Sequence, residues 1–368
     1  MSFRRAASVT LAIAASAVAL FPRVADPHET VNTTVLFDRE IVRVLNSHCV
    51  MCHVDGGPSF PLETYEQTWL ERRRISAAVI SRHMPPWPAL SGYGRFKNEN
   101  VVTLRESQFV VSWMEGLGPR NSGNVFTNTS DPNAPKPQPV RAKTDFTTWR
   151  LGKPDVVKEV PASGAIDLSL TSDRRLRAFE YKPADRRSVH AAVFTIKETG
   201  QWIASWTPWY GVVELPRGLS YRVPAGAHLV ASIQGTSGGE VGLLFDSTPG
   251  GQTVFDLIVE ARGPSTSLGA SSSRLHGETT LGEDTTLLAL RPDLIKGIAS
   301  IEVSARMPDG GTQVLLFAKD FQPEWPTPFV FAEPVKLRRG AIIAITAYGS
   351  AMALKTTISV VSSRPGRG

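Results

Sequence analysis

The stretch that most constrains this chain is His48-Cys49-Val50-Met51-Cys52-His53, which contains both cysteines of the 368 residues. The cysteines are spaced as C-x-x-C and a histidine follows directly, which is the pattern of c-type haem attachment. Two thiols one helical turn apart can each form a thioether with a haem vinyl group, and the adjacent imidazole can bind the iron. The motif therefore predicts one covalent haem c on Cys49 and Cys52, with His53 as an axial ligand.

Three other uses of a C-x-x-C pair compete with haem attachment. A structural zinc site needs four ligands, but the chain offers no second C-x-x-C half. A thioredoxin-like redox pair normally accompanies a βαβ pattern, which is not seen around this motif. A structural disulfide would leave His53 unexplained, so haem is the interpretation that uses all three residues.

A second iron ligand is expected downstream, in His83-Met84-Pro85-Pro86-Trp87, and Met84 follows His53 by 31 residues (84 minus 53). The two prolines restrict the backbone around Met84, so its thioether can be presented to a metal with little loss of entropy. His83 is the rival ligand, and a methionine that fills a gap in the core is the ordinary alternative. Methionine and histidine ligation raises the iron potential and suits electron transfer. The carbonyl of Pro58 or Pro61 is expected to accept the ring N–H of His53.

The first 25 residues read as a secretory signal peptide. Arg4 and Arg5 precede an apolar run from Ala6 to Phe21, and Ala17-Val18-Ala19 offers a small-residue cleavage site. The run is short for a membrane span, although a retained anchor stays open as the alternative. We expect an exported, periplasmic protein with no transmembrane segment in the mature chain.

The residues from 30 to 118 predict a small all-α domain around the haem. Apolar residues repeat at helical spacing from Val35 to Leu45, and a second helix is expected from about Thr64 to Ser81. Thr103 and Glu106 form a capping box that opens a third helix. Residues 119–145 are rich in proline and asparagine and predict a linker.

Beyond the linker the sequence predicts β structure, in one lobe from 146 to 262 and a second from 274 to 364, joined by the Gly/Ser-rich stretch Gly263–Ser273. No cysteine occurs here, so no disulfide can hold the lobes together. The fold class is therefore α + β multidomain, with a cytochrome c domain followed by two β-sandwich lobes. Strands are expected at Val189–Ile196, Leu229–Gln234, Val241–Phe245, Val254–Glu260, Ile298–Ala305, Val314–Phe317, Ala341–Tyr348 and Thr356–Val361.

These motifs carry a resemblance that covers most of the mature chain. The haem motif, Met84-Pro85-Pro86-Trp87 and Gly152-Lys153-Pro154-Asp155 resemble bacterial proteins in which a cytochrome c domain precedes a copper type II, ascorbate-dependent monooxygenase domain. The resemblance implies two jelly-roll lobes, similar to those of peptidylglycine hydroxylating monooxygenase. It also implies one copper ion in each lobe, bound by histidines on strands.

Most of the copper-ligand positions that the resemblance implies are substituted here. Val189-His190-Ala191 stands where the family has Val-His-His, and Gln234-Gly235 replaces its His-Tyr. Pro292-Asp293-Leu294-Ile295 replaces Pro-His-x-His, and Tyr348-Gly349-Ser350 is a reduced form of Tyr-Asp-Asn-Ser. His190 is the one family position that persists. A type 2 copper site uses several imidazoles, and only His190, His228 and His276 follow the linker, so we expect no copper.

The net charge of +6 and a pI of about 9.4 bear on partners. Basic residues cluster at Arg72–Arg74, Arg174–Arg177 and Arg186–Arg187. They can attract an acidic redox partner protein, or they can simply form a solvated basic surface. Nucleic acid is not expected as a partner of an exported haem protein, and the sequence leaves the oligomeric state open.

The function expected from the sequence is single-electron transfer by an exported monohaem cytochrome c whose β module has lost copper and acts as a scaffold or docking surface. A haem-coupled copper monooxygenase or other oxidoreductase with atypical ligands is the alternative. A β module that binds a small-molecule substrate is a third interpretation.

Overall fold

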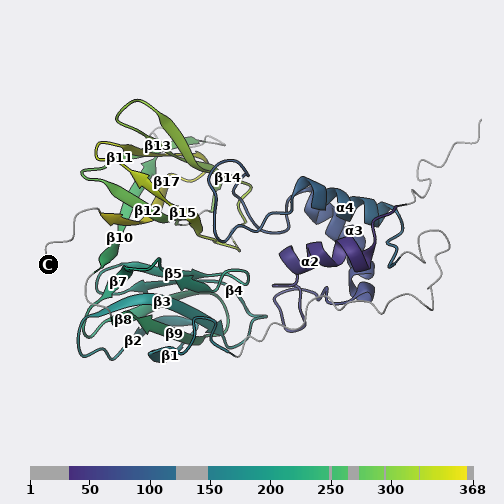
Figure 1. Cartoon of the computed structure of the whole chain (residues 1–368), viewed down its shortest axis with the longest axis horizontal. Coiled ribbons are helices and arrows are strands. Elements are labelled where there is room, and N and C mark those ends of the chain that lie inside the picture. The colour runs from purple at the N-terminus through teal and green to yellow at the C-terminus, as the bar shows by residue number, and fades with distance from the viewer. Residues whose placement is uncertain are drawn as a thin grey trace, which may run out of the picture.

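The computed structural model describes residues 33–121, 148–247, 251–263, 273–293, 296–322 and 324–362. The expected signal peptide, most of the expected linker and most of the Gly/Ser-rich joint lie outside these residues. A helical segment at the N-terminal side is followed by two strand-rich lobes, which lie on the other side of the molecule (Figure 1). The described chain is mostly β, as expected for the two lobes.

The helical segment contains η1 (Phe37–Ile41), α2 (Val42–His48), α3 (Tyr65–Ile80) and α4 (Leu104–Glu115). The three expected helices are confirmed, although the first is divided into a π-helical turn and α2. The Thr103–Glu106 capping box is also confirmed, and Thr64 with Gln67 caps α3 in the same way. None of the described helices combines the length and the apolar composition that a membrane span requires.

Seventeen strands make up the described β region: β1 (Val156–Val160), β2 (Ser163–Asp167), β3 (Arg174–Pro183), β4 (Val189–Ile196), β5 (Trp202–Trp206), β6 (Val212–Glu214), β7 (Leu219–Val223), β8 (His228–Gly235), β9 (Gly239–Phe245), β10 (Gln252–Arg262), β11 (Ser273–Thr280), β12 (Thr285–Pro292), β13 (Ile298–Arg306), β14 (Thr312–Lys319), β15 (Phe329–Leu337), β16 (Ile342–Gly349) and β17 (Ala353–Ser362). All eight strands expected from β-branched runs are present, with bounds that differ by at most three residues. Others, such as β3 and β11, carry too many charged or polar residues to be recognised from that pattern.

Each lobe has its own hydrophobic core. In the first lobe, β1, β9, β3 and β7 face the four-stranded sheet β2-β8-β4-β5, and residues such as Phe179 and Phe194 fill the space between them. The second lobe encloses a core that includes Leu290, Ile301 and Ile343. Strand β10 belongs to both lobes, because its first residues pair with β7 and its later residues pair with β17 and β11. The result is a pair of sandwich-like lobes connected by one continuous strand.

A long loop between α3 and α4 leaves the helices and packs onto the second lobe. Along residues 88–98, the backbone of this loop bonds to β14 and β15: Leu90 N donates to Phe317 O (2.8 Å) and Lys97 N donates to Val330 O (2.7 Å). The Phe96 side chain, 7% exposed, enters the core of the second lobe between Phe329 and Phe331. We call residues 88–98 the docking loop, because this segment attaches the helices to the β region.

We expect Phe96→Ala to lower the free energy of unfolding of the β region by about 3 kcal/mol, because the change leaves a cavity in a closed core. Tyr93→Ala is the matched control in the same loop. Tyr93 is 42% exposed and touches Phe317 at its edge, so about 1 kcal/mol is expected. Urea unfolding followed by tryptophan fluorescence measures both. Equal losses for the two variants would contradict the placement of Phe96.

A polar contact also joins the lobes where β10 passes between them. The Asp256 carboxylate accepts hydrogen bonds from Gln201 Nε2 (2.7 Å) and from the backbone N–H of Trp202 (2.6 Å). Burial raises the pKa of Asp256 to about 6, although these two donors and the nearby Arg291 oppose the shift. The native chain therefore holds a proton on Asp256 at a pH where the unfolded chain has released it.

This raised pKa predicts a pH dependence of stability. The contribution of Asp256 is favourable below about pH 4 and is lost as the pH rises through about 6, because the folded state binds this proton more tightly than the unfolded state does. We expect Asp256→Asn to remove about 2 kcal/mol of the change in stability between pH 4 and pH 7. Urea unfolding of both proteins at the two pH values gives this difference. An identical pH dependence in the variant would show that Asp256 does not titrate in this range.

Candidate functional site

The residues singled out from the sequence line one cavity of about 350 Å³ between the helical segment and the β region. Cys49, Cys52 and His53 form part of its wall, and His83 and Met84 form another part. Much of the remaining wall is apolar, from side chains that include Phe60, Leu62, Ile75, Ala78, Val79, Pro85 and Pro86. The structure thus brings together residues that are more than 30 positions apart in the sequence.

The C-x-x-C-H motif forms a compact turn at the end of α2. The N–H groups of Cys52 and His53 both donate to the carbonyl of Cys49, at 3.1 and 3.0 Å. A second turn follows at once, where Gly57 N donates to Val54 O (2.9 Å). A side chain at Gly57 would collide with the carbonyl of Cys52, so the motif can close into this turn only with glycine at position 57.

The hydrogen bond that His53 makes fixes which ring nitrogen is free. Nδ1 donates to the carbonyl of Phe60 at 2.9 Å, so the lone pair of the neutral ring lies on Nε2. Burial lowers the pKa of His53, and Arg74 lowers it further, while the bond to Phe60 acts in the opposite direction. The expected acceptor, Pro58 or Pro61, is therefore corrected to Phe60, which lies between them. A neutral imidazole with a free ring nitrogen has the form that can bind a metal.

The two cysteines are half-buried, and the pKa values of both thiols are raised. Burial raises the pKa of Cys49 to about 12, with smaller contributions from Cys52 and Glu106, and it raises the pKa of Cys52 to about 12 against the opposing charge of Arg186. Burial disfavours the thiolate form of both side chains. The cysteines are free, as covalent attachment of a group requires.

Met84 is placed by the end of α3. The backbone N–H groups of His83 and Met84 both donate to the carbonyl of Ala78, at 2.9 and 3.2 Å. The Met84 side chain is half-buried, whereas His83 is exposed. The carbonyl of His83 accepts from Gln322 Nε2 at 2.6 Å, so the second lobe also fixes this turn. Met84 and His83 both remain candidates by position, and the more buried Met84 is the better placed of the two.

His48 also lines the cavity, but its ring is occupied by neighbours. Its Nδ1 lies 2.9 Å from Asn100 Oδ1 and its Nε2 lies 3.2 Å from Glu106 Oε1. Both ring nitrogens therefore have oxygen partners, which leaves His53 as the histidine of the motif with a free nitrogen. His48 stabilises the attachment of α2 to α4.

The β region contributes Trp325 to the cavity wall, which the sequence did not predict. Its ring centroid lies 5.0 Å from that of His190 and 5.9 Å from that of Trp209. The aromatic contact therefore links the cavity directly to the first lobe. No motif marks Trp325, because its role depends on the packing of the lobes against the helices.

The other histidines of the β region lie apart from His190 and have their own partners. His228 Nδ1 is 2.8 Å from Glu198 Oε1, and His276 Nδ1 is 3.1 Å from Thr346 Oγ1. Asp293, which stands where the resemblance implies a copper ligand, forms ion pairs with Arg291 and Lys355. Within the described ranges, no group of three or more His, Cys, Asp or Glu residues is arranged to hold a metal ion.

Several arginines of the basic clusters make contacts within the chain. Arg186 Nη2 donates to the carbonyl of Met51 in the motif (3.2 Å), and Arg187 lies 3.7 Å from Asp55. Arg74 lies over the ring of Phe60, and Arg177 is 4.0 Å from Glu214. The cluster Arg186–Arg187 therefore holds the turn of the C-x-x-C-H motif against the first lobe.

Comparisons with known proteins do not assign the chain to a family. No protein-family model and no curated protein matches the sequence. The major capsid protein of bacteriophage PM2 is 7% identical over 58% of this chain and 97% of its own, with a TM-score of 0.29. A Paenibacillus xanthan lyase is 14% identical over 54% and 22%, with a TM-score of 0.20. Oxalate decarboxylase from Bacillus subtilis is 10% identical over 57% and 72%, with a TM-score of 0.16. Likenesses this distant carry no argument about function.

Proposed function

We propose that this chain is an exported monohaem cytochrome c that transfers single electrons. The observation that carries the proposal is that Cys49, Cys52, His53 and Met84 line the same cavity. The cavity volume falls within the range of cofactor pockets, and its apolar wall suits a porphyrin. The helical segment is then a small cytochrome c domain, and the two β lobes are jelly-roll-like, as the resemblance implies.

The donor groups of the cavity fit haem c. Cys49 and Cys52 supply two thiols for covalent attachment, His53 supplies a neutral ring nitrogen, and Met84 supplies a soft thioether. A bound haem provides one-electron chemistry, and the protein residues set its environment. The bond from His53 to Phe60 orients the imidazole, and the apolar side chains of the wall would shield a bound group from water. His53 and Met84 would both bind the iron, and ligation by histidine and methionine favours electron transfer over oxygen activation.

The β module acts in this proposal as a scaffold and docking surface for a redox partner protein. The docking loop, Trp325 and Arg186 fix the cavity to the lobes, so the module determines which part of the cavity wall a partner can approach. The positive net charge favours an acidic partner. Copper is not part of this function, although the chain retains His190 at one family position.

The attachment chemistry predicts the behaviour of single cysteine variants. We expect Cys49→Ala and Cys52→Ala, produced in a host that matures c-type cytochromes, to retain haem by one thioether at most. The pyridine haemochrome spectrum of each variant should shift to longer wavelength, because one vinyl group is left unsaturated. Ser47→Ala, next to the motif, is the control and should keep the parent spectrum. Unchanged spectra in both cysteine variants would contradict the thioether assignment.

The sixth ligand can be assigned by comparing two neighbouring residues. Met84→Ala should open the iron to exogenous ligands such as imidazole and should lower the reduction potential, because a thioether favours the reduced iron. His83→Ala should change neither property. Absorbance titration with imidazole and a redox titration measure both variants. Imidazole binding that appears only in His83→Ala would make His83 the ligand.

A second candidate function is an oxidoreductase in which the haem exchanges electrons with the β module, including a copper monooxygenase with atypical ligands. The contact between His190 and Trp325 favours it, because it connects the surviving family position to the cavity wall. Metal analysis of the purified mature chain separates the two functions. Copper equimolar with iron would favour the second candidate, and iron alone would favour the first.

A further inference from the structure

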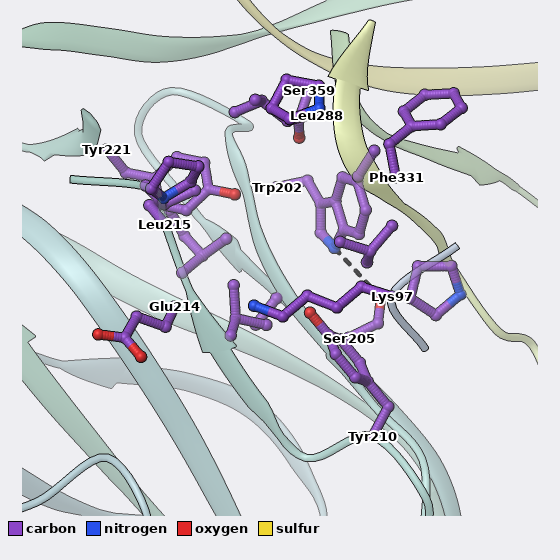
Figure 2. A pocket seen from close by; sticks show the side chains of 18 of the residues that line it. Lys97, Trp202, Ser205, Tyr210, Glu214, Leu215, Tyr221, Leu288, Phe331 and Ser359 are labelled. Carbon is purple, nitrogen blue, oxygen red and sulfur yellow. Dashed lines mark hydrogen bonds between the residues drawn. The ribbon is translucent and has the colours of Figure 1, made fainter. Parts of the chain in front are cut away.

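A second pocket, of about 220 Å³, lies where the two lobes and the docking loop meet (Figure 2). The first lobe contributes Trp202 and Ser205 from β5 and Tyr221 from β7. The second lobe contributes Phe331 from β15, and Lys97 comes from the docking loop. The pocket shares none of its lining residues with the cavity of the haem motif.

The size and wall of the pocket limit what can bind. A cavity of about 150 Å³ with an apolar wall can hold benzene, so this pocket has room for one aromatic ring and a small substituent. Aromatic side chains form much of the wall, and Ala289 and Leu288 cover another side. Such walls favour a flat, apolar ring through stacked or edge-on contacts.

The polar groups of the pocket are mainly hydrogen-bond donors. Lys97, an exposed residue, extends its ammonium group across the pocket (Figure 2), and the carboxylate of Glu214 pairs with Arg177 instead. Ser205 Oγ accepts from Trp202 Nε1 at 3.2 Å, which leaves its own O–H as a donor. Burial raises the pKa of Tyr210 to about 12, so this hydroxyl also keeps its proton.

One acidic residue, Glu214, also lines the pocket. It raises the competing interpretation that the pocket binds a cationic ligand. Its carboxylate is 60% exposed and lies 4.0 Å from Arg177, so its charge is partly compensated outside the pocket. A cationic ligand would have to use Glu214 and would place its charge near Lys97. An anionic ligand can accept hydrogen bonds from Lys97, Ser205 and Tyr210 together. These three donor side chains outnumber the one carboxylate, Glu214, so the pocket favours an anion.

We propose that the pocket between the lobes binds a small aromatic carboxylate, with the ring among the aromatic side chains and the carboxylate on Lys97. The site is separate from the proposed haem site and does not depend on it. Because Lys97 belongs to the docking loop, the ligand would contact both lobes and the segment that links them to the helices.

The test is isothermal titration calorimetry of the mature full-length chain with benzoate, phenylacetate and cinnamate, each carried into the millimolar range. We expect saturable binding of at least one of them at one site per chain. The matching neutral amide should bind about tenfold more weakly, because it lacks the charged hydrogen bond to Lys97. Absence of saturable binding for all three carboxylates overturns the proposal.

Single variants test whether the ligand carboxylate binds Lys97 itself or responds only to the overall charge of the protein. Lys97→Met should weaken binding of the carboxylate about tenfold and leave the amide unchanged, whereas Lys336→Met, on the exposed part of β15, should change neither. Glu214→Gln should strengthen carboxylate binding or leave it unchanged. Preference for benzylamine, lost in Glu214→Gln, would overturn the proposal in favour of a cation site. The Soret absorbance measures haem binding independently of the calorimetry. A failure of the carboxylate proposal can therefore be distinguished from a failure of the haem proposal.

Discussion

The pairing of the docking loop with β14 and β15 is the interaction on which the rest of the arrangement depends. Residues 88–98 follow Met84-Pro85-Pro86-Trp87, so attaching the loop to the second lobe also limits where the Met84 side chain can lie. The same attachment brings Trp325 to the cavity and Lys97 to the pocket between the lobes. Two cavities with different wall residues are therefore positioned by one loop and its backbone hydrogen bonds.

Burial gives the residues of the motif their chemical character. It raises the pKa values of Cys49 and Cys52 and lowers the pKa of His53, so it favours the neutral form of all three side chains. The hydrogen bond to Phe60 then selects Nε2 as the free nitrogen. The pKa shifts share one cause, because apolar side chains of the cavity wall reduce the contact of these three polar groups with water.

The sequence predicted the elements well where a local pattern carried the information. The Thr103–Glu106 box located the start of α4, and the β-branched runs located strands such as β4 and β13. The motif and Met84, which the sequence marked as one site, line one cavity, while their role stays a prediction. The signal peptide, the linker and the cytochrome identity stay predictions.

What the sequence did not predict depends on contacts between distant segments. The docking loop has no regular strand pattern, and its bonds to β14 and β15 form only after the second lobe has folded. Trp325 and Phe60 carry no motif, since one acts through packing and the other through its backbone carbonyl. Strand β3, with arginines at its start, resembles a charged surface segment until its inward residues meet the core.

The central claim is that haem is bound covalently at the C-x-x-C-H motif. Mass spectrometry of the proteolytic peptide that contains Cys49–His53, from protein exported by a maturation-competent host, tests it most directly. The account predicts a peptide heavier by one haem, with neither cysteine open to alkylation. A peptide of unmodified mass, with both thiols alkylated after unfolding, would contradict it.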